Sequence, residues 1–227
     1  RGQNTASTGE TGAVQVWPMD VPRDLYHTDW VADRTLAWLG EQGQSPWFCW
    51  MSFPDPHHPW DVPRSELHRV NWRDLDLPPA YLDGDEARRV LASKPKHWLG
   101  YYEASLWSNL ESPRNYVPAD MTPDQVREIN AMTHIENELI DEACQRVIDY
   151  LKAHDLYDHT DIFFTTDHGE LQGDYGLMFK GPYHVDALMR LPFIWKPGQI
   201  GVEPQVIDEP VGHVDLAPTF CAIAGIE

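Results

Sequence analysis

The stretch DIFFTTDHGE at residues 161–170 constrains the fold most, because a short apolar run breaks abruptly into an acid, an imidazole and a glycine. The run at 162–164 is β-branched or aromatic and follows a helical pattern, which is typical of a strand buried on both faces of a parallel sheet. Ligands of open α/β sheets bind beyond the carboxyl ends of the strands, so Asp167 and His168 lie where a site is expected. Gly169 allows a sharp exit, with a positive φ if the turn requires one. The pair is either half of a metal site or an Asx turn.

A second apolar run, WFCWMSF at residues 47–53, is closed by prolines and also predicts a buried strand. It leads into PDPHHPWD at 54–61, which holds His57 and His58. If both strands are parallel in one sheet, these imidazoles share an edge with Asp167 and His168. The alternative is a proline-rich surface loop with solvated histidines.

Helical periodicity predicts the elements around these two runs. The strongest helix begins at the capping residue Thr122, with Pro123 at its first position, and continues to about Ala153. Weaker patterns predict helices at 28–43, 85–91, 98–106 and 214–223, the last capped by His213 or Asp215, and a strand at 191–195. Residues 1–20 are predicted to be loop, and 64–118 a long irregular insertion of the kind that often serves as a lid. Lys180, about ten residues beyond the site, is either a surface lysine or folds back onto it.

Composition excludes several classes of function. The 227 residues suit one α/β domain, and the net charge of −19 argues against a surface for nucleic acid or an anionic membrane. No apolar run reaches the ~18 residues of a transmembrane helix. Cys49, Cys144 and Cys221 lack the paired spacing of a zinc or redox site. The chain starts at Arg1 and ends just after a helical pattern, so we expect a piece of a longer protein and predict neither compartment nor oligomeric state.

In this order, the segments resemble the sulfatase family, which shares the alkaline phosphatase fold. Four motifs carry the resemblance, which extends from about Asp29 to the end of the chain: SFPDPHHP at 52–59, TTDHGE at 165–170, GDYGL at 173–177 followed by Lys180 and Gly181, and HVDLAPT at 213–219 with AGI at 224–226. The resemblance implies an incomplete alkaline-phosphatase-like fold, with a mostly parallel sheet flanked by helices. Residues 1–227 would be the middle and later part of one catalytic domain.

The resemblance also implies roles for individual residues. Asp167 and His168 would bind a divalent cation, most often calcium in this family, although an imidazole ligand leaves Mn2+ or Mg2+ open. His57 would bind the sulfate group, with His58 as second choice, and Lys180 would bind the same anion. We therefore expect Asp167, His168, His57 and Lys180 to line one cleft.

One departure from the family pattern is large. The nucleophile, a formylglycine made in a Cys-x-Pro-x-Arg or Ser-x-Pro-x-Arg sequence, is missing, as are the paired aspartates that complete the metal shell. We therefore expect a sulfuric ester hydrolase, acting on a small-molecule or glycan sulfate ester, that is represented by an inactive fragment. The alternatives are a phosphonate or phosphate ester hydrolase of the same superfamily and a non-catalytic binding module that keeps the fold.

Overall fold

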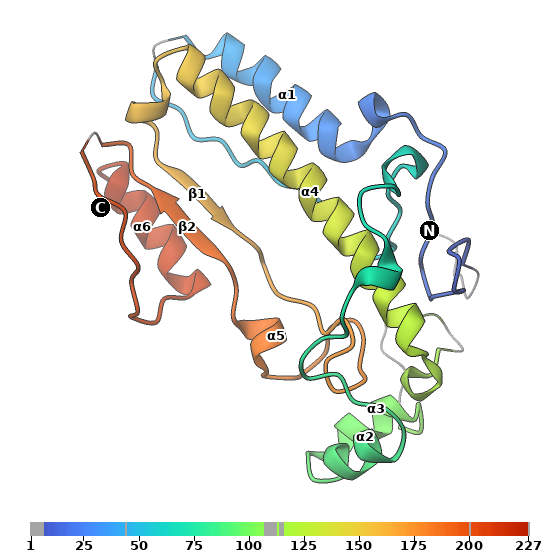
Figure 1. Ribbon diagram of the computed structural model, residues 1–227. Helices are drawn as coiled ribbons and strands as arrows, with labels where there is room; N and C mark the ends of the chain where they lie inside the picture. Colours follow the sequence, from blue (N-terminus) through green and yellow to red (C-terminus); the bar gives the residue numbers. More distant parts are fainter. Residues whose placement is uncertain (1–6, 44, 107–112, 114–115, 200, 227) are drawn as a thin grey trace.

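The computed structural model describes residues 7–226 except 44, 107–112, 114–115 and 200. Two long helices, α1 (His27–Glu41) and α4 (Pro123–Ala153), pack side by side. A two-stranded sheet made of β1 (Ile162–Thr165) and β2 (Phe193–Lys196) lies apart from them, and short helices fill the remaining corners (Figure 1). The chain is therefore of the mixed α/β class, as predicted.

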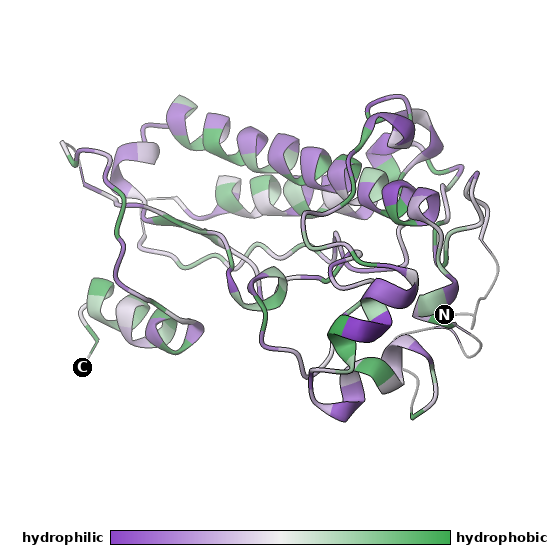
Figure 2. Cartoon of the chain, turned by 60° about the horizontal axis from the view of Figure 1, so that its bottom comes forward, coloured by the Kyte–Doolittle hydropathy of each residue, from purple (hydrophilic) through white to green (hydrophobic). Residues whose placement is uncertain are grey.

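Helix α4 forms where its sequence predicts it. The Thr122 hydroxyl accepts a hydrogen bond from the Gln125 backbone N–H, and the Gln125 side chain accepts one from the Thr122 N–H, which completes a capping box. Its apolar stripe, which includes Ile129, Ile135 and Leu139, is fully buried. Hydrophilic residues dominate the outer side of the helix pair (Figure 2), so burial of this stripe is what holds α4 in place.

The sheet differs from the prediction. Strands β1 and β2 form where expected but pair antiparallel, with Ile162 opposite Lys196 and Thr165 opposite Phe193. This pair is the whole sheet within the described residues, so a mostly parallel sheet is not confirmed. Phe164 is 42% exposed, so β1 is not buried on both faces. An apolar run predicts burial, but it does not predict the direction of the neighbouring strand.

The predicted strand at residues 47–53 is wrong, because the structure assigns no strand there. Its side chains alternate between exposed and half-buried, with Phe48 65% and Trp50 70% exposed. Phe48 packs on Phe220, and Trp47 packs on Trp38 of α1. The apolar side chains thus find partners, although no backbone within the described residues forms a ladder with the segment.

The insertion at 64–118 contains short helices packed on the core. They are η2 (Arg64–Glu66), η3 (Trp72–Asp74), α2 (Gly84–Leu91) and α3 (Lys96–Tyr102), with η4 (Pro118–Asp120) at its end. The helix predicted at 98–106 is therefore earlier and shorter, and residues 103–106 form a turn and a bend instead of helix. Leu91 and Tyr101 are buried, so the insertion contributes to the core instead of only covering a site.

Five further short helices complete the fold: η1 (Arg23–Leu25), η5 (Tyr157–His159), α5 (Asp186–Met189), η6 (His213–Asp215) and α6 (Leu216–Ile223). Helix α6 reaches β1 through Phe220, whose ring lies 4.9 Å from that of Phe163. Among the described residues, no helix has the length and apolar character needed to cross a membrane.

Residues 7–20 contain neither helix nor strand but are held by defined contacts. Residues 15–19 run parallel to 60–63 through isolated bridges, with the Trp17 N–H donating to the Trp60 carbonyl at 2.7 Å. The buried carboxylate of Glu128 on α4 accepts from the N–H groups of Glu10 and Thr11. These contacts hold the loop at residues 54–61 between the first segment and the helix pair.

Candidate functional site

Asp167 and His168 follow β1 directly and lie side by side. The Asp167 Oδ2 atom is 3.4 Å from the His168 Nε2 atom, and the side chains are 83% and 41% exposed. Asp167 Oδ1 accepts from the N–H of the next residue, His168, at 3.0 Å, whereas the Asx turn that the sequence left open would take the N–H two residues on. One carboxylate oxygen therefore shapes the turn while the other faces solvent beside the imidazole.

The His168 ring is oriented by the backbone. Its Nδ1 lies 2.9 Å from the Gly169 carbonyl oxygen, so this nitrogen carries the proton and donates it. The Nε2 atom next to Asp167 is then left with its lone pair. Backbone orientation of this kind is typical of a metal-binding histidine.

Gly169 is required for close approach rather than for a positive φ. Gly169 does not have a positive φ, although the sequence left that conformation open. A Cβ at this position would lie 1.8 Å from the Ala187 carbonyl oxygen. The Gly169 N–H also donates to the Leu188 carbonyl at 3.1 Å, so α5 is packed directly against the turn that carries Asp167 and His168.

Lys180 folds back toward this turn. Its Nζ lies 3.3 Å from the Glu170 Oε2 atom, and both side chains are largely buried, at 15% and 17% exposure. The insertion supports the segment between them, since the Tyr175 N–H donates to the Ala80 carbonyl and the Tyr101 hydroxyl donates to the Met178 carbonyl. Lys180 is therefore a positioned residue and not a freely solvated surface lysine.

The two histidines of the proline-rich loop differ in environment. His58 is 5% exposed, and its ring lies 4.7 Å from that of Phe179, the neighbour of Lys180. His57 is exposed, and its Nδ1 is 2.6 Å from the His58 carbonyl oxygen, to which it donates. The Nε2 atom of His57 remains available to a ligand, whereas His58 anchors the loop to the segment that carries Lys180.

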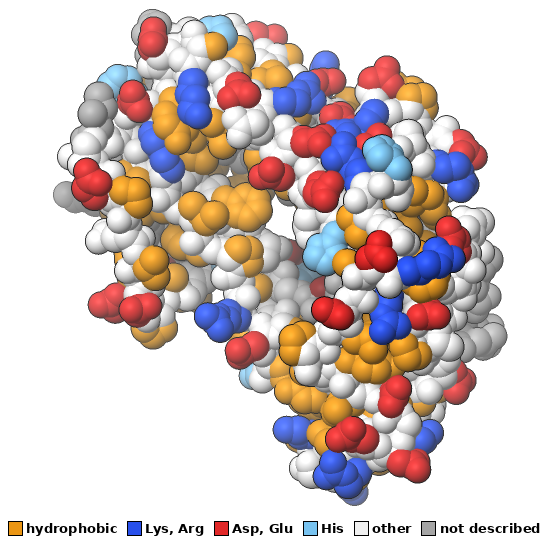
Figure 3. Space-filling view, viewed as in Figure 1, with side chains coloured by type: hydrophobic (Ala, Val, Ile, Leu, Met, Phe, Trp, Pro, Cys, Tyr) orange, Lys and Arg blue, Asp and Glu red, His pale blue; other side chains and the backbone are white. Residues whose placement is uncertain are grey.

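The three segments that hold the predicted site residues thus meet, but not all of the residues touch. Asp167 contacts His168, and Lys180 contacts Glu170 of the same turn. His57 stacks on His58, whose ring packs on Phe179, the neighbour of Lys180. In the part of the chain that the structure describes, no hydrogen bond or ion pair joins His57 to Asp167. Figure 3 shows that one face of the molecule is hollowed between its two sides.

Sequence reasoning missed a second cluster, formed by His27, Asp55, Asp61 and Glu136. His27 Nε2 lies 3.4 Å from Asp55 Oδ1 and 3.7 Å from Asp61 Oδ1, and Glu136 Oε1 accepts from the Asp61 N–H at 3.2 Å. A sequence signal existed, because Asp55 and Asp61 flank the histidines of the proline-rich loop. His27 and Glu136 come from two other elements, so only tertiary packing brings the set together.

Burial and mutual charge perturb this cluster. Burial raises the pKa of Asp55, and Asp61 raises it further, while His27, Thr28 and Tyr26 act in the opposite direction. Burial, together with Asp55 and Asp61, raises the pKa of Glu136 well above its usual range. Burial lowers the pKa of His27, but Asp61 and Asp55 raise it more, so the net shift is upward.

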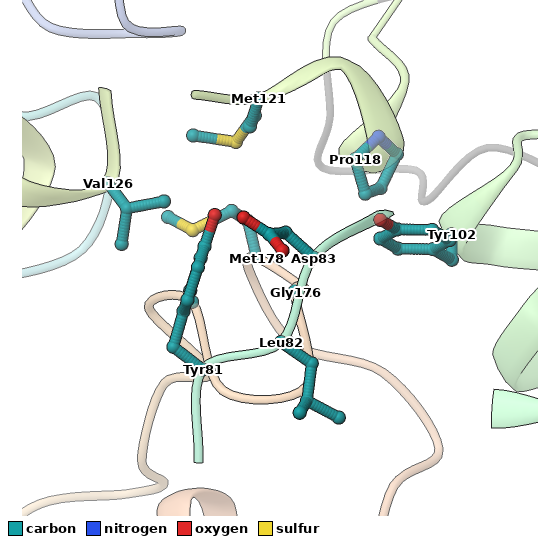
Figure 4. A pocket seen from close by; sticks show the side chains of 10 residues that line it. Tyr81, Leu82, Asp83, Tyr102, Pro118, Met121, Val126, Gly176 and Met178 are labelled. Atoms are coloured by element: carbon teal, nitrogen blue, oxygen red, sulfur yellow. The ribbon is translucent and has the colours of Figure 1, made fainter. Parts of the chain in front are cut away.

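The pocket drawn in Figure 4 is a packing gap away from these residues. Tyr81, Asp83, Tyr102, Met121 and Val126 line it, and the space inside is no larger than a water molecule. Burial, and to a lesser extent the charge of Asp83, raises the pKa of Tyr81 to about 12. The gap is too small to hold a substrate.

Two of the three thiols are unsuited to act as nucleophiles, because burial raises the pKa of both Cys49 and Cys144 and so disfavours the reactive thiolate. The third, Cys221, is an exposed free cysteine on α6.

Solved structures establish the class of protein. The chain superposes on a phosphonate monoester hydrolase, SpPMH from Silicibacter pomeroyi, with a TM-score of 0.78 and 25% identity over 98% of this chain and 43% of that one. The fold is therefore that of the sulfatases and alkaline-phosphatase-like hydrolases.

The chain belongs to the sulfatase family, since the family model described as Sulfatase matches residues 3–226. It is 29% identical to the uncharacterized sulfatase YidJ of Escherichia coli (strain K12) over 87% of this chain and 36% of that protein. It is 27% identical to an arylsulfatase of Clostridium perfringens (strain 13 / Type A) over 92% of this chain and 40% of that protein. The chain thus spans about two fifths of the length of these relatives.

Proposed function

We propose that the protein is a sulfuric ester hydrolase that cleaves small-molecule or glycan sulfate monoesters with the help of a divalent cation. The observation that carries the proposal is the Asp167–His168 pair, which presents a carboxylate oxygen and a nitrogen lone pair 3.4 Å apart at the end of β1. Membership of the sulfatase family supports sulfate esters as the substrate class.

The two side chains fit a divalent cation as part of its shell. Metal–ligand bonds of about 2.1 Å allow two ligand atoms to lie up to about 4 Å apart, and the 3.4 Å separation is within that limit. Calcium is the first expectation from the family, whereas a nitrogen ligand also suits Mn2+. When bound, the cation would polarise a sulfate oxygen and stabilise the charge that develops during ester cleavage. Asp167 and His168 would hold it there.

Lys180 and His57 are proposed to bind and orient the sulfate group. An ammonium group about 4 Å from an anionic oxygen stabilises it by about 4 kcal/mol at an effective dielectric of 20. Glu170 already holds the Lys180 ammonium group in place, so sulfate binding would not have to order a mobile side chain. The ammonium group would donate hydrogen bonds to both Glu170 and a sulfate oxygen. The His57 Nδ1 donates to a backbone carbonyl, so its Nε2 can donate to a substrate oxygen or protonate the leaving group when the ring is in its imidazolium form.

The nucleophile is proposed to be a formylglycine that does not derive from Cys49, Cys144 or Cys221. None of these three residues stands in a Cys-x-Pro-x-Arg sequence. The residues of this chain therefore supply metal and sulfate binding, and covalent chemistry requires a group they do not provide.

A phosphonate or phosphate ester hydrolase is the second candidate. The similarity to the phosphonate monoester hydrolase favours it, since that match covers 98% of this chain. Parallel assays with aryl sulfate, aryl phosphate and phosphonate monoesters separate the two. A higher kcat/KM for a phosphorus ester would replace the first proposal, and no turnover of any of them would favour a binding module.

Two substitutions test the assignment in the protein as its gene encodes it. Asp167→Ala should lose turnover and the metal ion bound at this site, one per chain, because it removes a ligand. Lys180→Ala should keep the metal and lose turnover, because the lysine acts on the anion. Metal content by mass spectrometry and sulfatase kinetics measure both effects, and Lys96→Ala, at an exposed lysine, is the matched control. Full metal occupancy in the Asp167→Ala variant would overturn the ligand assignment.

A further inference from the structure

The cluster missed by sequence reasoning has the composition and spacing of a metal site. The ligand atoms of His27, Asp55 and Asp61 all lie within 4.8 Å of one another. They come from α1 and from the loop at 54–61, and they lie beside Glu136 of α4. This is a different part of the fold from the turn after β1.

Two hydroxyl groups orient Asp55. The Tyr26 hydroxyl donates to Asp55 Oδ2 at 2.9 Å, and the Thr28 hydroxyl donates to the same oxygen at 2.7 Å. With Oδ2 occupied, Oδ1 is the oxygen that faces His27. The Asp55 carboxylate is 4% exposed, so its position is set by these donors and not by water.

Glu136 supplies an independent observation. Its side chain is fully buried, at 0% exposure, and its Oε2 atom has no hydrogen-bond partner among the described residues. Its other oxygen accepts from the Asp61 N–H, which places the carboxylate against the cluster. A buried carboxylate oxygen without a partner is costly, and such groups normally pair or coordinate a metal.

Charge within the cluster points the same way. Three carboxylates face one imidazole, so even a fully protonated His27 leaves an excess of negative charge in a buried place.

We propose that His27, Asp55 and Asp61, with Glu136 as a further oxygen ligand, bind a divalent transition metal ion, Mn2+ or Zn2+. An imidazole ligand disfavours Ca2+ and Mg2+, which take oxygen ligands, whereas Mn2+ and Zn2+ accept nitrogen and oxygen together. The site is separate from Asp167 and His168. It ties α1 and α4 to the loop that carries His57.

The test measures Mn2+ binding in a protein whose other site is removed. In an Asp167→Ala/His168→Ala background, calorimetry should still detect one Mn2+ per chain. Electron spin echo spectroscopy should detect a histidine nitrogen bound to that Mn2+. Asp61→Asn and His27→Gln should each weaken Mn2+ binding at least about tenfold, because loss of a partner that only orients a ligand already weakens metal binding by about that much. His27→Gln should also abolish the nitrogen signal.

Matched controls remove the same charge or ring elsewhere. Asp141→Asn and His134→Gln change exposed residues of α4 and should leave Mn2+ affinity unchanged. Absence of Mn2+ binding in the background variant, or equal affinity after Asp61→Asn, would overturn the proposal. So would tighter binding of Ca2+ than of Mn2+ and Zn2+.

A second measurement covers the case in which the double variant does not fold, as judged by circular dichroism. The unaltered protein should then bind two metal ions per chain and the Asp61→Asn variant one. Equal stoichiometry in the two proteins would refute the site. Because the readout is metal binding, loss of the proposed sulfatase activity would not affect this result.

Discussion

Replacing Gly169 by alanine tests whether α5 positions the turn that carries Asp167 and His168. The new Cβ would lie 1.8 Å from the Ala187 carbonyl oxygen and 2.8 Å from the carbonyl carbon, whereas real Cβ contacts are essentially never under 3.0 Å. The obstacle is backbone, so the turn and α5 must separate by more than 1 Å. That shift would break the 3.1 Å hydrogen bond from the Gly169 N–H to the Leu188 carbonyl.

The expected cost follows from these two effects. Overpacking costs about 1–3 kcal/mol, and an unsatisfied buried group costs about 1–3 kcal/mol. Gly169→Ala should therefore lower the free energy of unfolding by about 2–6 kcal/mol. Because the displaced turn carries Asp167 and His168, metal content and sulfate ester turnover should fall as well.

Gly40→Ala provides the matched control. Its Cβ would meet only the Tyr150 hydroxyl, at 3.7 Å, and it lies within α1. Alanine in a helix should raise stability by about 0.5–1 kcal/mol. Urea unfolding followed by circular dichroism, with metal content measured on the same samples, compares the two. Unchanged stability and metal content in Gly169→Ala would refute the argument that close packing of α5 holds the site.

Three further predictions concern stability and activity. Ile135→Ala should lower the free energy of unfolding by about 2–5 kcal/mol in urea titrations, because Ile135 is 0% exposed on the core face of α4. Burial raises the pKa of Glu66, but hydrogen bonds from Arg69 and Ser65 and the charge of Arg23 lower it more, so its folded pKa is below the usual value of 4.5. The ionised Glu66 carboxylate therefore stabilises the fold above pH 4.5, and this contribution is lost as the pH falls through its folded pKa. The Glu66→Gln variant should be less stable than the unaltered protein at pH 7 and should lose less stability on acidification. Identical dependence of stability on pH in the two proteins would contradict this. The 227 residues expressed alone should not hydrolyse sulfate esters, because a nucleophile is needed; turnover equal to that of the protein as its gene encodes it would refute that prediction.

Local signals in the sequence were sufficient for the helices and for the ends of the strands. Thr122, Pro123 and Gln125 predicted the start of α4 because a cap and a first turn are made within a few residues. The apolar run before Asp167 predicted β1, and the four motifs in order predicted the family to which the chain belongs. The assignment of Asp167, His168, His57 and Lys180 to one cleft stays a prediction.

Contacts between distant residues were decided by tertiary structure. WFCWMSF has the composition of a strand, but a strand also needs a neighbouring backbone, and the run at 47–53 has none among the described residues. The direction of β2 against β1 likewise depends on how the chain returns from α5, which an apolar pattern does not encode. His27, Asp55 and Glu136 are separated by many residues, and their carboxylates and imidazole meet only because α1 packs on α4. The sequence alone thus determined α4 with its cap, the position of β1 and the family, because these depend on neighbouring residues, whereas strand pairing and the second cluster required the packed chain.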